Sequence, residues 1–324
     1  MTSVTSLFAP VEDDLAQLVE NLKQLIGARH PVLFAAAEHL FKSGGKRVRP
    51  AIVLLLARAV ADAGVEISPR HRRLAEITEM IHNASLFHDD VVDEAEMRRG
   101  VTTVNYEFGN RIAIQAGDFL FAQASWYLAN LDNLEVVKLL SEVIKDLAEG
   151  EIQQGFSSFD VALTLENYLE KSYYKTASLI ANSSKAVGVL SEAPADLTQD
   201  FYEFGRAVGL AFQIVDDILD FTSTVDALGK PACADLKSGN LTAPVLFAME
   251  EKPYLQVLIE RELTEPGDLE EAIALINHSQ GIARSRALAE EYAASAVQRL
   301  AKLPASDAKQ ALIELTDYIL KRLY

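Results

Sequence analysis

The chain of 324 residues carries 30 Lys and Arg against 47 Asp and Glu, a formal net charge of −17 at pH 7. Such a charge argues against nucleic-acid binding through a basic face and against electrostatic docking on an anionic membrane. Hydrophobic residues make up 49%, which is too apolar for disorder and enough for a large core. The single cysteine, Cys233, rules out an intramolecular disulfide and is compatible with a reducing compartment.

The hydrophobic periodicity is helical almost everywhere, and no run of alternating β-branched residues predicts a strand. We expect helices at 11–26, 31–42, 50–63, 69–94, 111–130, 134–157, 164–189, 198–224, 240–250, 254–262, 268–278, 280–302 and 305–322. No linker or internal repeat separates them, so we expect one all-α domain over residues 1–324. No apolar stretch is long enough to cross a bilayer and no leader pattern opens the chain, so we expect a cytoplasmic protein.

One expected helix is apolar on nearly every side. The segment Ile112–Leu131 includes Phe119-Leu120-Phe121 and Trp126-Tyr127 and has almost no charged face. Such a helix belongs either in the middle of a large bundle or at a subunit interface, and the pattern leaves both open.

Two matching acidic motifs lie toward the C-terminal ends of long apolar helices: Asp89-Asp90-Val-Val-Asp93 and Asp216-Asp217-Ile-Leu-Asp220. The first and last Asp of each motif share one helix face about 6 Å apart and repel each other. They also sit at the helix end that disfavours anions. Carboxylates that act together with substrate phosphates are the usual Mg²⁺ ligands, so the pattern predicts magnesium sites. The alternative is solvated charge on an acidic protein.

Positive charge is scarce yet recurs in short motifs. The turn Gly44-Gly45-Lys46-Arg47-Val48-Arg49-Pro50 leads into a helix, and Arg98-Arg99-Gly100 follows the first Asp motif. Taken singly, each motif has an alternative: ordinary solvation for the turn, and neutralisation of Asp93, Glu94 and Glu96 for Arg98-Arg99. Together with two metal-binding motifs they suit a diphosphate. No Walker-type or Gly-x-Gly-x-x-Gly loop indicates a nucleotide, and the apolar surroundings predict a hydrocarbon substrate.

These motifs resemble the trans-prenyl diphosphate synthases. The matching blocks are Gly44–Pro50, His88–Gly100, Tyr174–Ser178, Gly209–Asp220 and Gly229–Pro231. The flanking stretches Phe121–Asn130 and Gly239–Ala248 are similar to the branch of the family that makes solanesyl diphosphate, the plastoquinone side chain, in cyanobacteria and plastids. Because the chain starts close to its first helix, the cyanobacterial form is the better match.

The resemblance implies long antiparallel helices around a central cavity, in a homodimer. It implies that an allylic diphosphate, held through two or three Mg²⁺ ions by both Asp motifs, ionises and is attacked by isopentenyl diphosphate. The residues implied for isopentenyl diphosphate are Lys46, Arg49, His82 and Arg99. Those implied for the allylic substrate are Arg98, Lys175, Thr176, Gln213 and Lys230. No nucleic acid is implied, and at most a peripheral membrane contact during product release.

Product length is the last feature that the sequence addresses. Residues at i−4, i−8 and i−11 from Asp89 face the same direction along its helix, namely Ser85, Ile81 and Thr78, and Ala84 borders them. Short-chain members of the family typically carry an aromatic four or five residues before the first Asp. Both positions are small here, which favours an open helix face and a long product. The resemblance implies about forty to fifty carbons, with about forty-five favoured.

Alternatives to this interpretation remain. Ala84 and Ser85 are small also if they form a close helix–helix contact. The alternative functions are a shorter-chain synthase making farnesyl or geranylgeranyl diphosphate, a cyclase, and a non-catalytic partner subunit. The Gly-Gly-Lys-Arg turn disfavours a cyclase, and the two complete Asp motifs disfavour a non-catalytic subunit.

Overall fold

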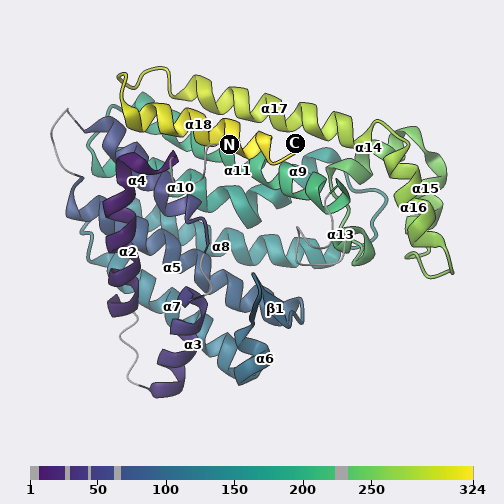
Figure 1. Ribbon diagram of the computed structural model, residues 1–324, viewed down its shortest axis with the longest axis horizontal. Helices are drawn as coiled ribbons and strands as arrows, with labels where there is room; N and C mark the ends of the chain where they lie inside the picture. Colours follow the sequence, from purple (N-terminus) through teal and green to yellow (C-terminus); the bar gives the residue numbers. More distant parts are fainter. Residues whose placement is uncertain (1–6, 26–29, 43–44, 62–66, 223–232, 324) are drawn as a thin grey trace. The chain divides into compact units, whose positions relative to one another are not determined.

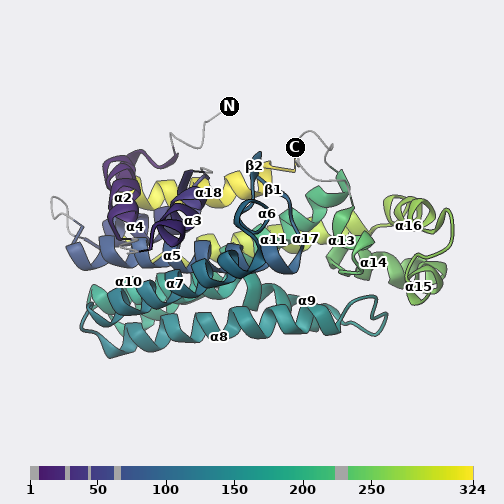
Figure 2. The ribbon, with the colours of Figure 1, turned by 90° about the horizontal axis from the view of Figure 1, so that it is seen from below.

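Helices make up most of the computed structural model, which describes residues 7–25, 30–42, 45–61, 67–222 and 233–323 (Figures 1 and 2). The chain forms two units that alternate along the sequence. The first comprises Met1–Ile144, Leu179–Tyr202 and Leu300–Glu314, and the second Lys145–Ser178, Glu203–Arg299 and Leu315–Tyr324. The expected all-α fold class is confirmed, whereas a single domain over residues 1–324 stays a prediction.

The elements in chain order are η1 (Ala9–Val11), α2 (Glu12–Leu25), α3 (Pro31–Lys42), α4 (Val48–Val60), α5 (Pro69–Val92), β1 (Met97–Arg98), β2 (Val101–Thr102), α6 (Val104–Phe108), α7 (Asn110–Ala129), α8 (Leu134–Phe156), α9 (Leu165–Ser172), η2 (Tyr173–Ala177), α10 (Ser178–Leu190), α11 (Ala195–Thr222), α13 (Ala234–Lys237), α14 (Ala243–Glu251), α15 (Pro253–Glu260), α16 (Asp268–Asn277), α17 (Gly281–Arg299) and α18 (Asp307–Lys321). No helix of the described residues is long and apolar enough to cross a membrane.

The expectation that the chain forms no strand is wrong at one hairpin. β1 and β2 pair antiparallel, with Arg98 opposite Val101. Both turn residues, Arg99 and Gly100, have positive φ angles of 53° and 77°, as a two-residue hairpin turn requires. Strands of two residues are too short to show an alternating pattern in a sequence.

Helix α5 is the centre of the first unit. It begins with Pro69 at its first position, after Ser68, whose side chain accepts a hydrogen bond from the backbone N–H of His71. It packs against α4 and most extensively against α7 (Figures 1 and 2). The two backbones approach closely at Gly117, where a Cβ atom would overlap the His88 ring and lie 3.2 Å from the Ala84 carbonyl oxygen.

Helix α7 is buried on one side only. Ile114 and Trp126 are 41% and 60% exposed, and Asp118 and Ala122, at i+4 intervals between them, are also exposed. The exposures show that α7 is not enclosed on all sides in a single chain. A subunit interface at this helix stays a prediction.

The segment expected as one helix over 164–189 is interrupted in the second unit. A π-helical turn, η2, separates α9 from α10. A Cβ atom on Gly209 of α11 would lie 2.5 Å from the Ala177 Cα, and one on Gly150 of α8 would lie 2.9 Å from the Tyr174 Cβ. The wider turn thus fits because two neighbouring helices present only a glycine to it.

Candidate functional site

The first Asp motif ends α5. The backbone N–H of Asp93 caps the helix by donating to the Asp89 carbonyl oxygen at 2.8 Å. Asp89 is half-buried and Asp93 exposed, whereas Asp90 is only 3% exposed. Nε of Arg98 donates to Oδ1 of Asp90 at 2.7 Å. Burial raises the pKa of Asp90 and the Arg98 charge opposes this rise. The motif therefore has one buried, paired carboxylate and two that solvent reaches.

The segment after α5 is fixed by side-chain hydrogen bonds to backbone carbonyls. Nδ2 of Asn105 donates to the carbonyl oxygens of Asp90 at 3.1 Å and Ala95 at 3.0 Å. The Thr103 hydroxyl also donates to Ala95. These bonds tie the segment after the end of α5 to the helix, and they hold the hairpin that carries Arg98 and Arg99.

The residues implied for isopentenyl diphosphate come together in the first unit. Nη1 of Arg49 donates to Nε2 of His82 at 3.3 Å. Burial, together with Arg49, Arg99 and Arg98, lowers the pKa of His82 well below its ordinary value, so the ring is neutral and carries its proton on Nδ1. Gly45, with φ of +147°, leaves room for the Arg99 guanidinium, which a Cβ atom would overlap. Lys46 follows directly and is exposed.

Sequence reasoning missed Glu79, which lies three residues before His82 on α5. Burial raises the pKa of Glu79, while the charges of Arg49, Arg47 and Arg99 lower it. An acid therefore lies within the arginine cluster and offsets its mutual repulsion. Glu79 is one of two acids, with Glu76, in the otherwise apolar stretch that precedes the first Asp motif, and nothing in the sequence distinguishes it.

The second Asp motif, on α11, also buries its second Asp. The Tyr168 hydroxyl donates to Oδ2 of Asp217, and Nε2 of Gln213 donates to Oδ1 at 2.8 Å. The Thr176 hydroxyl donates to Oε1 of Gln213 at 2.7 Å. Burial raises the pKa of Asp217 to about 8, and the two hydrogen bonds act in the opposite direction. Thr176, Gln213 and Asp217 are thus linked, and Tyr168, which the sequence did not reveal, completes the network.

The other two carboxylates of this motif differ in accessibility. The Asp216 side chain is 37% exposed, and its Oδ1 lies 2.7 Å from Nη2 of Arg322. Asp220 is buried, and its Oδ2 accepts the backbone N–H of Asp235 at 3.2 Å. Asp216 is therefore the member of this motif that a ligand reaches most easily. Arg322 carried no signal in the sequence.

The remaining expected residues are placed as follows. Lys175, on η2, donates to Oε1 of Gln154 at 2.9 Å and pairs with Glu151 at 2.8 Å. Lys230 lies outside the described residues. Thr78, Ile81 and Ala84 are fully buried, while Ser85 is partly exposed and its hydroxyl donates to the His82 carbonyl oxygen at 2.9 Å.

The carboxylate oxygens at both motifs suit a hard divalent cation as ligands. Within the part of the chain that the structure describes, no three His, Cys, Asp or Glu side chains converge to hold a metal ion by themselves. The accessible atoms of Asp89, Asp93 and Asp216 are carboxylate oxygens, which favour Mg²⁺ over softer ions. Mg²⁺ is usually held by one or two carboxylates and completed by substrate phosphates. The residues present therefore fit magnesium.

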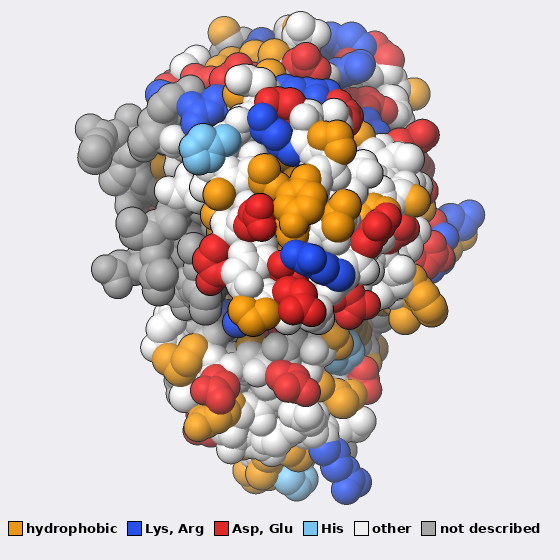
Figure 3. All heavy atoms as spheres, turned by 90° about the vertical axis from the view of Figure 1, so that its right-hand side faces the viewer, with side chains coloured by type: hydrophobic (Ala, Val, Ile, Leu, Met, Phe, Trp, Pro, Cys, Tyr) orange, Lys and Arg blue, Asp and Glu red, His pale blue; other side chains and the backbone are white. Residues whose placement is uncertain are grey.

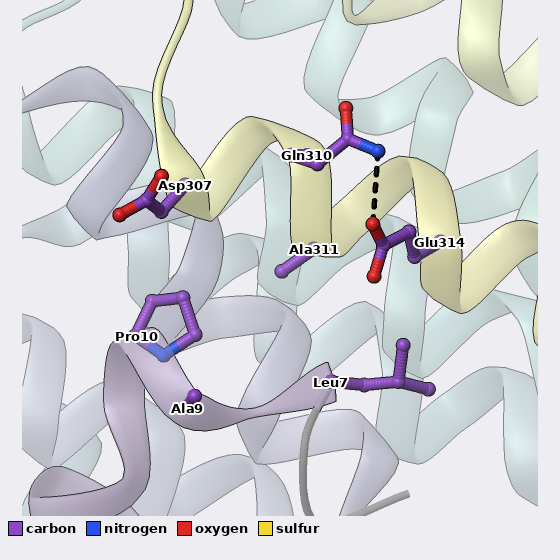
Figure 4. A pocket seen from close by; sticks show the side chains of 7 residues that line it. All are labelled: Leu7, Ala9, Pro10, Asp307, Gln310, Ala311 and Glu314. Atoms are coloured by element: carbon purple, nitrogen blue, oxygen red, sulfur yellow. Dashed lines mark hydrogen bonds between the residues drawn. The ribbon is translucent and has the colours of Figure 1, made fainter. Parts of the chain in front are cut away.

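Two further surface features include none of the expected residues. A cavity of 360 Å³ in the first unit is lined by Leu7, Ala9, Pro10, Asp307, Gln310, Ala311 and Glu314 (Figure 4). Gln310 and Glu314 are hydrogen-bonded across one side of it at 3.0 Å. On α15, Tyr254 and Val257 are half-exposed. The face toward which α15 and α16 lie shows apolar side chains among acidic and basic ones (Figure 3).

Comparisons with known proteins match the whole chain. Residues 30–276 match the family described as Polyprenyl synthetase. The chain is 65% identical to a "Prenyl transferase" of Synechocystis sp., over the full length of both. It is 54% identical to "Solanesyl diphosphate synthase 1, chloroplastic" of Arabidopsis thaliana, over 99% of this chain and 80% of that protein. A polyprenyl synthase of Caulobacter crescentus, solved with calcium and isoprenyl diphosphate, superposes with a TM-score of 0.91 at 33% identity, over 99% and 98% of the chains.

Asp217 makes the stability of the fold depend on pH. Its pKa of about 8 lies above the ordinary value of 3.8, so its contribution to stability is complete below that lower value and is lost as the pH rises to about 8. Asp217→Asn cannot ionise and lacks this dependence. We expect the free energy of unfolding of the wild type, relative to the variant, to fall by about 1 kcal/mol per pH unit between pH ~5 and ~8.

Urea unfolding of both proteins at several pH values measures this difference. The variant itself is less stable at low pH because an amide cannot accept both hydrogen bonds. Parallel pH profiles would show that Asp217 is ionised in the folded chain throughout this range.

Proposed function

The chain belongs to the polyprenyl synthetase family and is a prenyltransferase of the long-chain prenyl diphosphate synthase type, and on that premise we propose its substrates, site residues and product. We propose that it adds isopentenyl diphosphate repeatedly to an allylic diphosphate. The observation that supports this most is the shared layout of the two Asp motifs. Each buries its second Asp against dedicated donors and leaves its first Asp accessible.

The metal ligands that we propose are the accessible carboxylates of Asp89, Asp93 and Asp216. Asp90 and Asp217, which were expected as ligands, would instead hold the motifs in place, because both are buried and accept hydrogen bonds within the fold. Asp220, which was also expected as a ligand, is buried and would likewise hold the second motif in place. Bound Mg²⁺ would supply stabilisation of the negative charge that grows on the departing diphosphate.

The two diphosphates would be bound by different residues. Arg49, Arg99 and Lys46 would hold isopentenyl diphosphate, which is not ionised, and the neutral His82 would orient Arg49 through their hydrogen bond. Lys175, Thr176, Gln213, Arg98 and Lys230 would serve the allylic substrate. Fixed positive charge there stabilises the transition state more than the ground state, because the leaving diphosphate gains charge as the bond breaks.

The buried side chains below the first motif would keep water from the carbocation. Ile81 and Thr78 are fully buried one and two turns beyond Ser85 on α5. An apolar environment protects a reactive cation from hydrolysis.

The expected cytoplasmic location of the protein stays a prediction.

The direct test is to incubate the purified chain with farnesyl or geranylgeranyl diphosphate, isopentenyl diphosphate and Mg²⁺, and to size the product. We expect a product of about C45 by resemblance, and no elongation after chelation of the metal. Asp89→Asn and Asp216→Asn should each lower the rate about a hundredfold or more, because each removes a proposed metal ligand. Glu260→Gln, an exposed acid on α15, is the matched control and should leave the rate unchanged.

Near-normal turnover by either Asp variant would contradict the metal assignment. A product of C15 to C20 would instead support the shorter-chain alternative. A folded chain without any elongation activity would support the partner-subunit alternative.

Product length should respond to Ser85. A phenylalanine there would occupy the helix face below Asp89 without touching either diphosphate, so Ser85→Phe should shorten the product to about C15–C20 while the first condensation stays fast. Ala84 is the poorer choice, because it is fully buried and an added ring would overpack the core. Ser85→Ala, which only removes the hydrogen bond to His82, should keep the full length. Full-length product from folded Ser85→Phe would show that the chain does not pass this position.

We also propose a homodimer formed through the exposed face of α7. Ile114, Ala122 and Trp126, with Asp118 between them, present exposed apolar side chains that a second copy would cover. Sedimentation velocity should find a dimer for the wild type and a monomer for Trp126→Glu, which places a charge in the interface. Tyr254→Glu, at a half-exposed aromatic on α15, should stay dimeric. A dimeric Trp126→Glu protein or a monomeric wild type would contradict this interface.

A further inference from the structure

Arg322, just after the end of α18, forms an ion pair with Asp216, the proposed metal ligand of the second motif. Nη2 of Arg322 is 2.7 Å from Oδ1 of Asp216, and the two side chains are 24% and 37% exposed. The guanidinium carbon also lies 4.9 Å from the centre of the Phe212 ring. Phe212 and Asp216 are four residues apart on α11, so Arg322 lies along one face of that helix.

The surroundings explain why a cation is held there. Asp216 and Asp235 both raise the pKa of the buried Asp217, so their negative charges act on the same region. A guanidinium on Asp216 reduces this repulsion in the absence of metal. The hydrogen-bonding capacity of the Arg322 guanidinium is only partly used, because its Nη1 is buried without a hydrogen-bond partner among the described residues. An ion pair with an unsatisfied buried donor is less stable than a fully bonded one and easier to displace.

We propose that Arg322 is a resident counter-ion that a divalent cation must displace from Asp216, and that it thereby sets the metal affinity of the second motif. The inference rests on the proposed function, in which Asp216 is a metal ligand. A guanidinium and a divalent cation on one carboxylate repel each other, so binding of the second lowers the affinity of the first. Arg322 is in this sense a positioning residue, which acts through Asp216.

The experiment is a titration of the substrate-free protein with Mn²⁺, in which electron paramagnetic resonance measures the free ion. The component of binding that Asp216→Asn removes reports the second motif. For that component, Arg322→Gln should bind Mn²⁺ about three- to tenfold more tightly, as the loss of a partly exposed ion pair implies. Arg322→Met, which keeps the packing on Phe212, should show the same increase. Arg322→Lys keeps the charge and should stay within about twofold of the wild type.

Arg284 provides a matched control in the same unit. Its guanidinium lies 4.1 Å from the centre of the Phe247 ring and pairs with Glu250 at 2.6 Å, a similar contact away from the Asp motif. Arg284→Gln should leave Mn²⁺ affinity unchanged. An equal increase in Arg284→Gln would show a general effect of net charge and would overturn the proposal.

Unchanged or weaker Mn²⁺ binding in folded Arg322→Gln and Arg322→Met would also overturn it. Failure of the underlying function would look different, because Asp216→Asn would then bind Mn²⁺ as the wild type does, whatever the Arg322 variants show. Thermal unfolding of each variant confirms that the titrated protein is folded.

Discussion

The hydrogen bonds to the second Asp of each motif are the interaction on which the rest of the site depends. A buried carboxylate without donors is costly, so Asp90 needs Arg98, and Asp217 needs Tyr168 and Gln213. Once the second Asp is fixed, the helix geometry determines where the other Asp residues of the motif lie. The first Asp lies one residue back and remains accessible to solvent at the helix surface. The second Asp adds little to the repulsion within each motif, because Arg98 offsets the charge of Asp90 and the raised pKa of Asp217 keeps that side chain protonated below about pH 8.

The site also requires that the backbones of neighbouring helices approach each other closely beside the Asp motifs. Gly117 lets α7 lie against α5 beside the first motif, and Gly150 and Gly209 leave space for the π-helical turn that carries Lys175 and Thr176. The turn directs the Thr176 hydroxyl to Gln213, which in turn bonds to Asp217. A side chain expected to serve the substrate is therefore linked to the buried Asp by packing that depends on two glycines.

Local patterns predicted the helices and the two Asp motifs, because these depend on residues close together in the chain. The expected helix at 69–94 and the observed α5 agree within two residues. The π-helical turn was missed because five residues are too few to distinguish its period from that of an α-helix. Tyr168 and Arg322 were missed because each reaches its Asp across a long stretch of chain, 49 positions in the case of Tyr168. Glu79 looked like an ordinary helix residue, and only the folded chain brings three arginines near it.

The measurement that tests this account most directly compares metal binding and stability across four variants, Asp89→Asn, Asp90→Asn, Asp216→Asn and Asp217→Asn. Mn²⁺ titration gives the first quantity and urea unfolding of the metal-free protein gives the second. The account predicts that the variants of Asp89 and Asp216 lose Mn²⁺ binding and keep their stability, because they remove accessible ligands. It predicts that at pH ~5 the variants of Asp90 and Asp217 lose about 1–3 kcal/mol of stability. Asp90→Asn loses the ion pair with Arg98, and Asp217→Asn cannot accept the hydrogen bonds of both Tyr168 and Gln213. The opposite division, with Asp89 and Asp216 needed for stability and Asp90 and Asp217 needed only for Mn²⁺, would contradict it.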